Sequence, residues 1–179
     1  MAKRARRTKS PFAGKLDLFY RCDFSFSRSR SAELHTLREV SLRETHSALR
    51  RDLAALQQAA YAVAWLEQTT EIETPLPGLY LLFRDWLQHL AATTPACHLV
   101  FGLELKLLHE LGLGPDLESA RLSPGTKAIA TRLATLDWPS AAHCRPSPAQ
   151  AEELRQFLHG YLIYHLGRIP RGRAPALEW

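Results

Sequence analysis

Residues 96–117 read A-C-H-L-V-F-G-L-E-L-K-L-L-H-E-L-G-L-G-P-D-L, and this stretch predicts the helix around which the rest of the chain is organised. At 100° per residue, its large apolar side chains cover roughly two thirds of the helix circumference, an arc too wide for an ordinary surface helix. Gly112 stands where a left-handed residue ends a helix, and Pro115 prevents its continuation. We therefore expect a central helix that is packed on several sides.

One acidic residue, Glu104, lies in the middle of this apolar arc. A carboxylate in such a place must be paired, hydrogen-bonded or neutralised. It could act as a general base with a raised pKa. We expect instead a structural ion-pair partner, and the candidate counterions are Arg84, Arg121 and Arg168.

The composition fits one domain, or one domain with a smaller appendage. The 179 residues are 46% apolar, and no window approaches the roughly 18 apolar residues of a membrane span. The chain opens with charge rather than with an apolar signal segment. Cys22, Cys97 and Cys144 form no C-x-x-C pair, which argues against a disulfide framework and suits a reducing compartment. We expect a cytoplasmic protein with no membrane partner.

The basic charge is concentrated at one end of the chain. Residues 1–30 hold nine Lys/Arg against Asp17 and Asp23, a local charge of +7, so the rest of the +5 chain sums to about −2. This asymmetry predicts a polyanion-binding arm on a near-neutral body. Residues 1–14, M-A-K-R-A-R-R-T-K-S-P-F-A-G, could lie on a phosphate backbone. They could also be a solvated tail, or a transit or nuclear-import signal.

Residues 16–26 alternate with period two and are rich in aromatic side chains, which predicts a β-strand. A polar turn over 27–31 and a second strand over 34–42 would complete a hairpin. An isolated hairpin is marginal in water, so either the sheet packs on the helical part or strands that complete it are missing. The alternation places Phe19 on the face opposite Tyr20, outside the expected core.

The remaining sequence predicts helices over 47–71, 77–92, 97–111, 123–136 and 147–166, with a loop over 138–146. Ser123-Pro124 and Ser147-Pro148 are helix starts of the N-cap-plus-proline type, and Gln150 suits a capping box. The fold class is therefore α+β. We expect a β segment of two to three strands in residues 1–45 and a bundle-like domain of about five helices in 46–179.

Motifs for chemistry are absent from the sequence. It contains no P-loop, dinucleotide-binding, nucleophile-elbow or H-E-x-x-H pattern. Two pairs could in principle assemble a zinc site across the fold, although neither has ligand-type spacing: Cys97-His98 and His143-Cys144. We expect no enzyme, no catalytic residue, no cofactor and no bound metal.

Several segments in consistent order resemble the bacterial DNA repair protein RecO (recombination protein O) family. The opening A-K-R-A-R-R-T-K-S-P-F-A-G is similar to the family's A-K-G-A-R-R-x-K-S-x-F-x-G. Residues 103–117, L-E-L-K-L-L-H-E-L-G-L-G-P-D-L, resemble F-E-L-x-L-L-x-x-L-G-Y-x-P-x-L. Residues 161–173, Y-L-I-Y-H-L-G-R-I-P-R-G-R, resemble the closing Y-L-x-x-H-L-G-R-x-L-K-S-R. The resemblance covers nearly the whole chain.

The resemblance implies an N-terminal OB-fold followed by a helical domain. It implies a non-enzymatic activity: binding single- and double-stranded DNA, annealing complementary strands, and helping RecR to load the RecA recombinase in homologous recombination. An OB barrel binds a strand with a basic groove and aromatic platforms. Suitable residues for these are Phe19, Tyr20, Phe24 and Phe26, with Arg28 and Arg30 at the turn, and Phe19 is the better candidate for a stacking residue outside the core. The full set of expected DNA-binding residues is Lys3, Arg4, Arg6, Arg7, Lys9, Phe19, Arg28, Arg30, Arg168, Arg171 and Arg173.

The chain departs from the family pattern in three respects. It begins inside the expected barrel, so the OB-fold is incomplete, or the true start lies upstream, or a partner supplies the rest. Residues 118–146 hold Cys144 alone, where many members carry two C-x-x-C pairs, so structural zinc is not expected. Phe101-Gly102 replaces an Arg that can help to hold the acidic C-terminal tail of single-stranded DNA-binding protein, although an apolar groove could still take the tail's hydrophobic end.

Two hypotheses follow. The first is a nucleoid-associated mediator of DNA repair that binds DNA, promotes annealing and aids RecA loading. The alternative is a protein-interaction module of the recombination machinery, which binds RecR or the tail of single-stranded DNA-binding protein without handling DNA itself.

Overall fold

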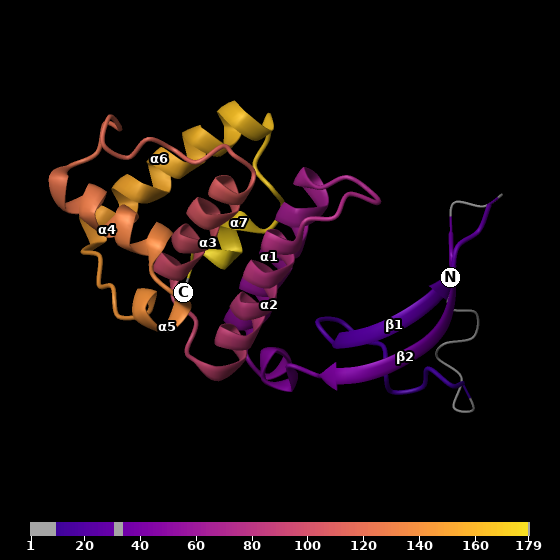
Figure 1. The fold of residues 1–179 in the computed structure, drawn as a ribbon. Helices are drawn as coiled ribbons and strands as arrows, with labels where there is room; N and C mark the ends of the chain where they lie inside the picture. Colours follow the sequence, from indigo (N-terminus) through magenta and orange to yellow (C-terminus); the bar gives the residue numbers. More distant parts are fainter. Residues whose placement is uncertain (1–9, 31–33, 179) are drawn as a thin grey trace. The chain divides into compact units, whose positions relative to one another are not determined.

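The computed structural model describes residues 10–30 and 34–178, which form a two-stranded sheet followed by helices (Figure 1). The predicted α+β class is confirmed. The chain divides into two units, and the boundary in the sequence lies between Ser47 and Ala48. The elements are β1 (Arg21–Ser27), β2 (Thr36–Glu44), the 3-10 helix η1 (Ser47–Arg51), α1 (Leu53–Thr69), α2 (Pro77–Ala92), α3 (Cys97–Glu110), α4 (Pro124–Thr135), α5 (Trp138–Ala141), α6 (Pro148–Leu166) and α7 (Arg173–Ala176).

The first unit contains an antiparallel hairpin whose register places apolar side chains on one face. Cys22 lies opposite Leu42, and Phe24 lies opposite Val40. Opposed residues point to the same side of a sheet, so these side chains form one apolar face. A register shift follows Ser25. Of this face Val40 is buried, whereas the rings of β1 are exposed.

β1 begins five residues later than the alternation predicts, so the predicted strand over residues 16–20 is wrong. The backbone turns at Asp17, whose carbonyl accepts a hydrogen bond from the Tyr20 amide at 3.2 Å. Phe19 adopts a positive φ of 61°, which is incompatible with a continuing strand. The alternation of apolar and polar residues does not reveal such a turn, because it is a pattern of residue types and carries no information on the backbone angles.

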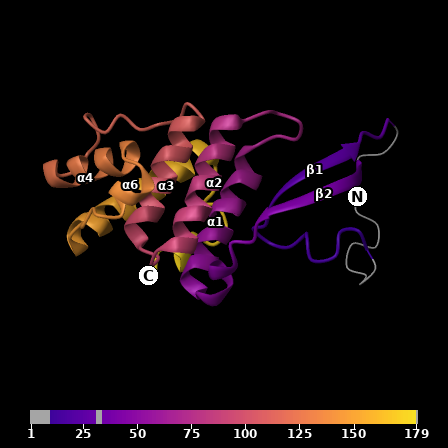
Figure 2. The same ribbon diagram turned by 60° about the horizontal axis from the view of Figure 1, so that its bottom comes forward.

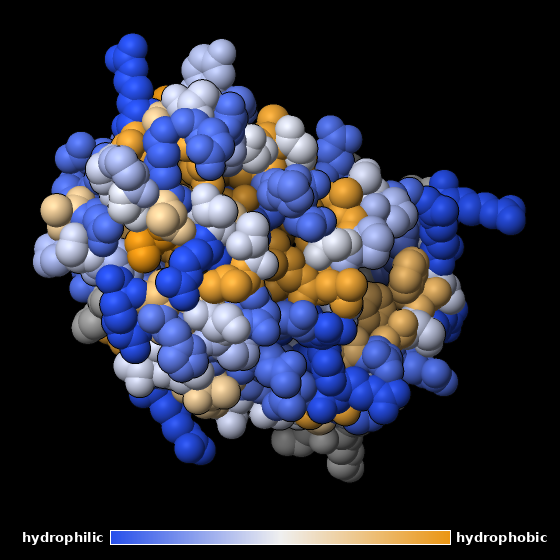
Figure 3. All heavy atoms as spheres, turned by 60° about the vertical axis from the view of Figure 1, so that its left-hand side comes forward, coloured by the Kyte–Doolittle hydropathy of each residue, from blue (hydrophilic) through white to orange (hydrophobic). Residues whose placement is uncertain are grey.

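The second unit is built around α3, as the sequence predicts. All residues from His98 to Leu105 are buried, as are Leu107 and Leu108. Figures 1 and 2 show α3 between α1 and α2 on one side and α4 and α6 on the other. Gly102 permits the close approach of α4, because a β-carbon there would lie 3.3 Å from the Leu133 carbonyl oxygen. Hydrophobic side chains also show through the hydrophilic surface on the face seen in Figure 3.

The predicted helix ends are largely observed. α2 has the predicted bounds, and Gly112 has the left-handed φ of 70° expected after α3. Two short helices were not predicted: α5 lies inside the predicted loop, and α7 follows α6. α5 begins at an N-cap, since the Asp137 carboxylate accepts the Ser140 amide at 2.8 Å. A four-residue helix leaves no periodicity in the sequence from which it could be recognised.

The N-terminus of α6 provides a direct test of the helix-start chemistry. Ser147 Oγ accepts the Gln150 amide at 3.3 Å, and the Gln150 side chain accepts the Ser147 amide at 2.8 Å. Ser147→Ala should lower the free energy of unfolding by about 1 kcal/mol, measured by urea denaturation. Ser147→Asp, which keeps an oxygen acceptor, should retain most of the wild-type stability. Equal stability of the alanine variant and wild type would contradict the assignment.

Candidate nucleic-acid surface and helical pocket

Three rings form a row on the hairpin, two of them exposed and one half-buried, which we call the hairpin strip: Phe24, Phe26 and His35. The ring centroids of Phe24 and Phe26 lie 6.1 Å apart, and Phe26 stacks on His35 at 5.3 Å with an interplanar angle of 5°. Phe24 is 62% and Phe26 51% exposed. Flat exposed rings of this kind can stack on nucleic-acid bases, because every base has a π-face.

The cationic side chains of the hairpin form two groups. Within the sheet the arginines are engaged: Arg43 pairs with Asp23 at 2.6 Å, and Arg38 Nε donates to Ser27 Oγ at 2.6 Å. Beyond β1, Arg28 and Arg30 are exposed in the turn. The turn end of the hairpin thus carries two exposed arginines, two and four residues after Phe26 in the sequence.

The expected DNA-binding residues differ in where the structure places them and in how exposed they are. Phe19 is half-buried in the turn before β1, and its carbonyl accepts a hydrogen bond from His46 Nδ1 at 2.8 Å. Its predicted place on the outer face of a strand is wrong. Arg28, Arg30, Arg168 and Arg171 are exposed. Five further expected residues lie outside the described ranges: Lys3, Arg4, Arg6, Arg7 and Lys9.

Phe24 and Phe26 were among the rings that the sequence offered for stacking, but Phe19 was preferred to them as a ring outside the core. Alternation assigns both to the face of Tyr20, which was expected to be core. Whether a ring on such a face is buried depends on what covers the sheet, and a strand's own sequence does not contain that information.

Arg173 corrects another expectation, because this predicted phosphate contact is buried. It is 5% exposed, and its Nε and Nη2 atoms donate to Glu104 Oε1 and Oε2 at 2.7 and 3.0 Å. Tyr61 adds a third hydrogen bond, from its hydroxyl to Oε1 at 2.6 Å. Glu104 is fully buried, so the prediction of a structural ion-pair partner is confirmed. The candidate counterions Arg84, Arg121 and Arg168 were wrong.

The charge states of Tyr61, Glu104 and Arg173 favour one another in this buried cluster. Burial raises the pKa of Tyr61 well above its usual value, and the Glu104 charge raises it further. Burial would lower the pKa of Arg173, but its hydrogen bonds with Glu104 and the carboxylate charge raise it. Tyr61 therefore remains a hydrogen-bond donor and Arg173 a cation, and the bidentate geometry offsets part of the desolvation cost of both charges.

Further hydrogen bonds hold the segment around α7 in place. Gln58 Nε2 on α1 donates to the Ala176 carbonyl at 3.2 Å, and Arg155 Nη2 on α6 donates to the Leu177 carbonyl at 3.3 Å. Arg173 Nη2 also donates to the Arg155 carbonyl at 3.4 Å. The buried cluster thus connects α1, α3, α6 and α7.

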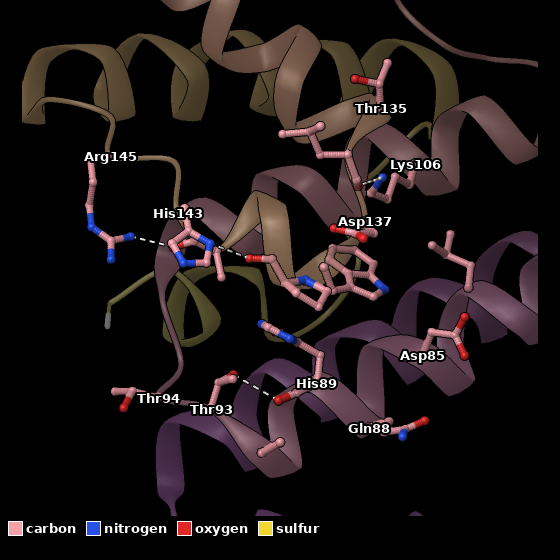
Figure 4. A pocket seen from close by; sticks show the side chains of 16 residues that line it. Asp85, Gln88, His89, Thr93, Thr94, Lys106, Thr135, Asp137, His143 and Arg145 are labelled. Atoms are coloured by element: carbon pink, nitrogen blue, oxygen red, sulfur yellow. Dashed lines mark hydrogen bonds between the residues drawn. The ribbon is translucent and has the colours of Figure 1, made fainter.

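A pocket of about 990 Å³ lies between α2, α5 and the loop after α5 (Figure 4). Apolar groups from Leu82, Trp138 and Pro139 contribute to its lining. Figure 4 shows Lys106 at one end of this helical pocket and Arg145 at the other. Asp85 and Asp137 also line it, but Asp85 pairs with Arg84 at 2.7 Å and Asp137 caps α5.

Lys106 is the cation most firmly placed in the helical pocket. Its ammonium donates to the Ala134 and Leu136 carbonyls at 3.0 and 2.7 Å and lies 5.3 Å from the Trp138 ring centroid. Burial lowers the pKa of Lys106, and it also lowers that of His89 in the same pocket. An uncharged His89 leaves Lys106 and Arg145 as the positive groups at the two ends of an apolar floor.

Metal ligands and membrane spans are both absent from the described residues. Within 10–30 and 34–178, no three His, Cys, Asp or Glu side chains come together as metal ligands. Cys22, Cys97 and Cys144 are free thiols. In the same ranges, no helix has both the length and the apolar character of a membrane span.

Comparisons with known proteins find that the chain is similar to proteins named DNA repair protein RecO. Residues 50–120 match the family described as recombination protein O, C terminal. The chain is 30% identical over 118 residues to DNA repair protein RecO of Bacillus pumilus, which covers 66% of this chain and 45% of the relative. It is 28% identical over 149 residues to DNA repair protein RecO of Myxococcus xanthus, and this match covers 83% of this chain and 60% of the relative.

A third relative gives similar values. DNA repair protein RecO of Listeria monocytogenes is 30% identical over 122 residues, covering 68% of this chain and 47% of the relative. The chain thus spans about half the length of the curated relatives that it matches. No solved structure matches it significantly.

The buried cluster generates a test of the role of Arg173. Arg173→Met should lower the free energy of unfolding by about 3–5 kcal/mol, because Glu104 would keep its charge without a counterion. Glu104→Leu combined with Arg173→Met should recover much of that loss in urea denaturation, since no buried charge remains. Arg168→Met, at an exposed position, is the control for stability and should leave the free energy of unfolding unchanged. A fully stable Arg173→Met protein that has lost DNA affinity would show that Arg173 contacts DNA.

Proposed function

The helical unit of this chain belongs to the recombination protein O family, and we propose that the chain is a DNA-binding mediator of DNA repair and homologous recombination. The names of the relatives support the process. The charge distribution supports the ligand. Residues 1–47 contain eleven Lys/Arg against five Asp/Glu, a net of +6, and residues 48–179 contain twelve against thirteen, a net of −1. The net positive charge thus belongs to the unit that carries the hairpin strip.

The observation that carries this proposal is the hairpin strip beside Arg28 and Arg30. Base–aromatic stacking contributes about 1–3 kcal/mol per base and tolerates any sequence. Arginines next to the rings can neutralise the phosphates of the same strand, which adds affinity without sequence preference. Phe24 and Phe26, with His35 stacked on Phe26, would receive bases, and the turn arginines would hold the backbone.

The proposed mechanism consists of binding and needs no covalent chemistry. A protein that neutralises phosphates on two complementary strands lowers their mutual repulsion and raises their local concentration, which favours annealing. Double-stranded DNA would be bound through phosphates alone, because its bases are already stacked. Cooperation with a RecR-like partner and assistance to RecA loading belong to this proposal through the family.

The first test is oligonucleotide binding by fluorescence anisotropy. With roughly six to ten phosphate contacts, affinity should fall about 10³- to 10⁵-fold between 50 and 200 mM salt. Phe24→Ala with Phe26→Ala should weaken binding of single strands by about 1–3 kcal/mol per lost stack while leaving duplex binding nearly unchanged. Tyr80→Ala, at an exposed aromatic residue of α2, is the matched control. If the phenylalanine variant loses stability and keeps its DNA affinity, the strip is a packing surface.

A second function, binding of the acidic tail of single-stranded DNA-binding protein, is supported by the helical pocket. The family's Arg position is occupied by Gly102, where a β-carbon would already lie 3.3 Å from the Leu133 carbonyl oxygen and 3.7 Å from Trp138. Lys106, one helical turn later, supplies a cation at the same pocket. With Arg145 at the far end and Trp138 between them, the pocket suits a peptide that combines carboxylates with an apolar end.

This second function predicts that a short acidic peptide with an apolar C-terminal residue binds the chain in isothermal titration calorimetry. Arg145→Gln should lower its affinity by about 1 kcal/mol or more, through loss of a charge-assisted contact. Arg132→Gln, on the exposed surface of α4, is the control. An affinity unaffected by Arg145→Gln and by amidation of the peptide's C-terminus would exclude a carboxylate site. The phenylalanine variant of the hairpin strip should still bind the peptide, which separates the two functions.

A further inference from the structure

The C-terminal half of α6 and the segment after it differ in charge from the rest of the helical unit. Residues 154–177 contain four arginines, two histidines and no acidic residue. The remainder of the unit therefore has eight Lys/Arg against thirteen Asp/Glu. A basic segment on an otherwise acidic body marks a surface that would attract a polyanion.

Aromatic rings accompany this charge along α6. Phe157 and Tyr161 are in contact at 5.7 Å between centroids, and Tyr161 and His165 at 4.3 Å. Tyr164 meets the edge of His165 at 4.9 Å and is 84% exposed. Tyr161 is fixed by its hydroxyl, which donates to the Leu113 carbonyl at 3.0 Å. Tyr164 is therefore an exposed ring supported by rings that are held in place.

Two arginines follow at the end of the helix. Gly167 ends α6 in the left-handed conformation, and the Arg168 carbonyl accepts a hydrogen bond from Gln68 Nε2 at 3.0 Å, which holds this segment on α1. Arg168 and Arg171 line a hollow of about 180 Å³. Neither has an ion-pair partner among residues 10–30 and 34–178. Glu67 is the one acidic side chain that lines the hollow with them.

We propose that Tyr164, His165, Arg168 and Arg171, here called the α6 surface, form a second contact for single-stranded DNA, on the helical unit. Tyr164 stacks on a base, and the two arginines contact phosphates. The proposal rests on the DNA-binding function proposed above and adds a strand site outside the hairpin. A chain with two such sites can hold two strands at once, which is what annealing requires.

The charge and geometry favour a nucleic acid over a protein as the occupant. An exposed ring at the end of α6, followed in the sequence by two exposed arginines without an acidic ion-pair partner among the described residues, is a combination suited to a single strand, since the ring can receive a base and the guanidinium groups its phosphates. Duplex DNA would use the arginines without the ring. The α6 surface should therefore discriminate between strand forms through Tyr164.

The test measures oligothymidine and duplex binding by the full chain, with variants of each group. Tyr164→Ala should weaken binding of the single strand by about 5- to 150-fold and leave duplex binding nearly unchanged, whereas Tyr164→Phe should bind as wild type. Arg168→Gln with Arg171→Gln should weaken both forms and reduce the slope of log affinity against log salt by about 2. Glu67→Gln should strengthen both, because it removes a repulsive charge. Tyr80→Ala is the control.

Strand annealing of two complementary oligonucleotides gives an independent readout. Tyr164→Ala and the Phe24→Ala, Phe26→Ala pair should each slow annealing, and the combined variant should lose it. If wild type binds DNA and both α6 variants bind and anneal as wild type, the α6 surface is overturned while the proposed function stands. Loss of binding to purified RecR with unchanged DNA affinity would assign the surface to a protein instead. A wild-type chain with no DNA affinity would overturn both proposals.

Discussion

The helical unit depends on how one buried carboxylate is compensated. α3 is surrounded by other elements, so Glu104 has no access to water and must find its partners within the protein. Tyr61 from α1 and Arg173 from α7 provide them, at 2.6 and 2.7 Å. A purely apolar residue at this position would pack as well. It would specify the arrangement of the helices less strictly, because it would not require a particular arginine at the centre of the unit.

The same cluster determines which basic residues are available for binding. Arg168, Arg171 and Arg173 are close in sequence, yet the third points inward to Glu104 while the other two remain exposed. Gly172, with a left-handed φ of 86°, lies between Arg171 and Arg173, and hydrogen bonds from Gln58 and Arg155 hold the end of the α7 segment. The inward arginine thereby positions the outward pair on the surface of α1 and α6. Structural and binding roles are divided among residues that look equivalent in the sequence.

The sequence predicted what depends on local patterns. The apolar arc of α3, the capping residues of α4 and α6, and the bounds of α2 follow from helical periodicity and N-cap chemistry. It could not identify Arg173 as the counterion, because the two residues are 69 positions apart and several arginines fit equally well. Phe19 was misplaced because a single positive φ ends the strand pattern. Phe24 and Phe26 were ranked below Phe19 because their exposure depends on what covers the sheet.

The separation between Glu104 and Arg173 also affects the order in which the protein can fold. During synthesis, Glu104 is made 69 residues before its counterion. Until Arg173 arrives, a carboxylate inside α3 must stay hydrated or take up a proton, so α3 cannot be sealed by α1, α2 and α4 alone. The buried charge thus makes completion of the core conditional on the segment that carries Arg168 and Arg171. A chain interrupted before that segment would expose an unfinished apolar helix, which is a signal that chaperones and proteases recognise.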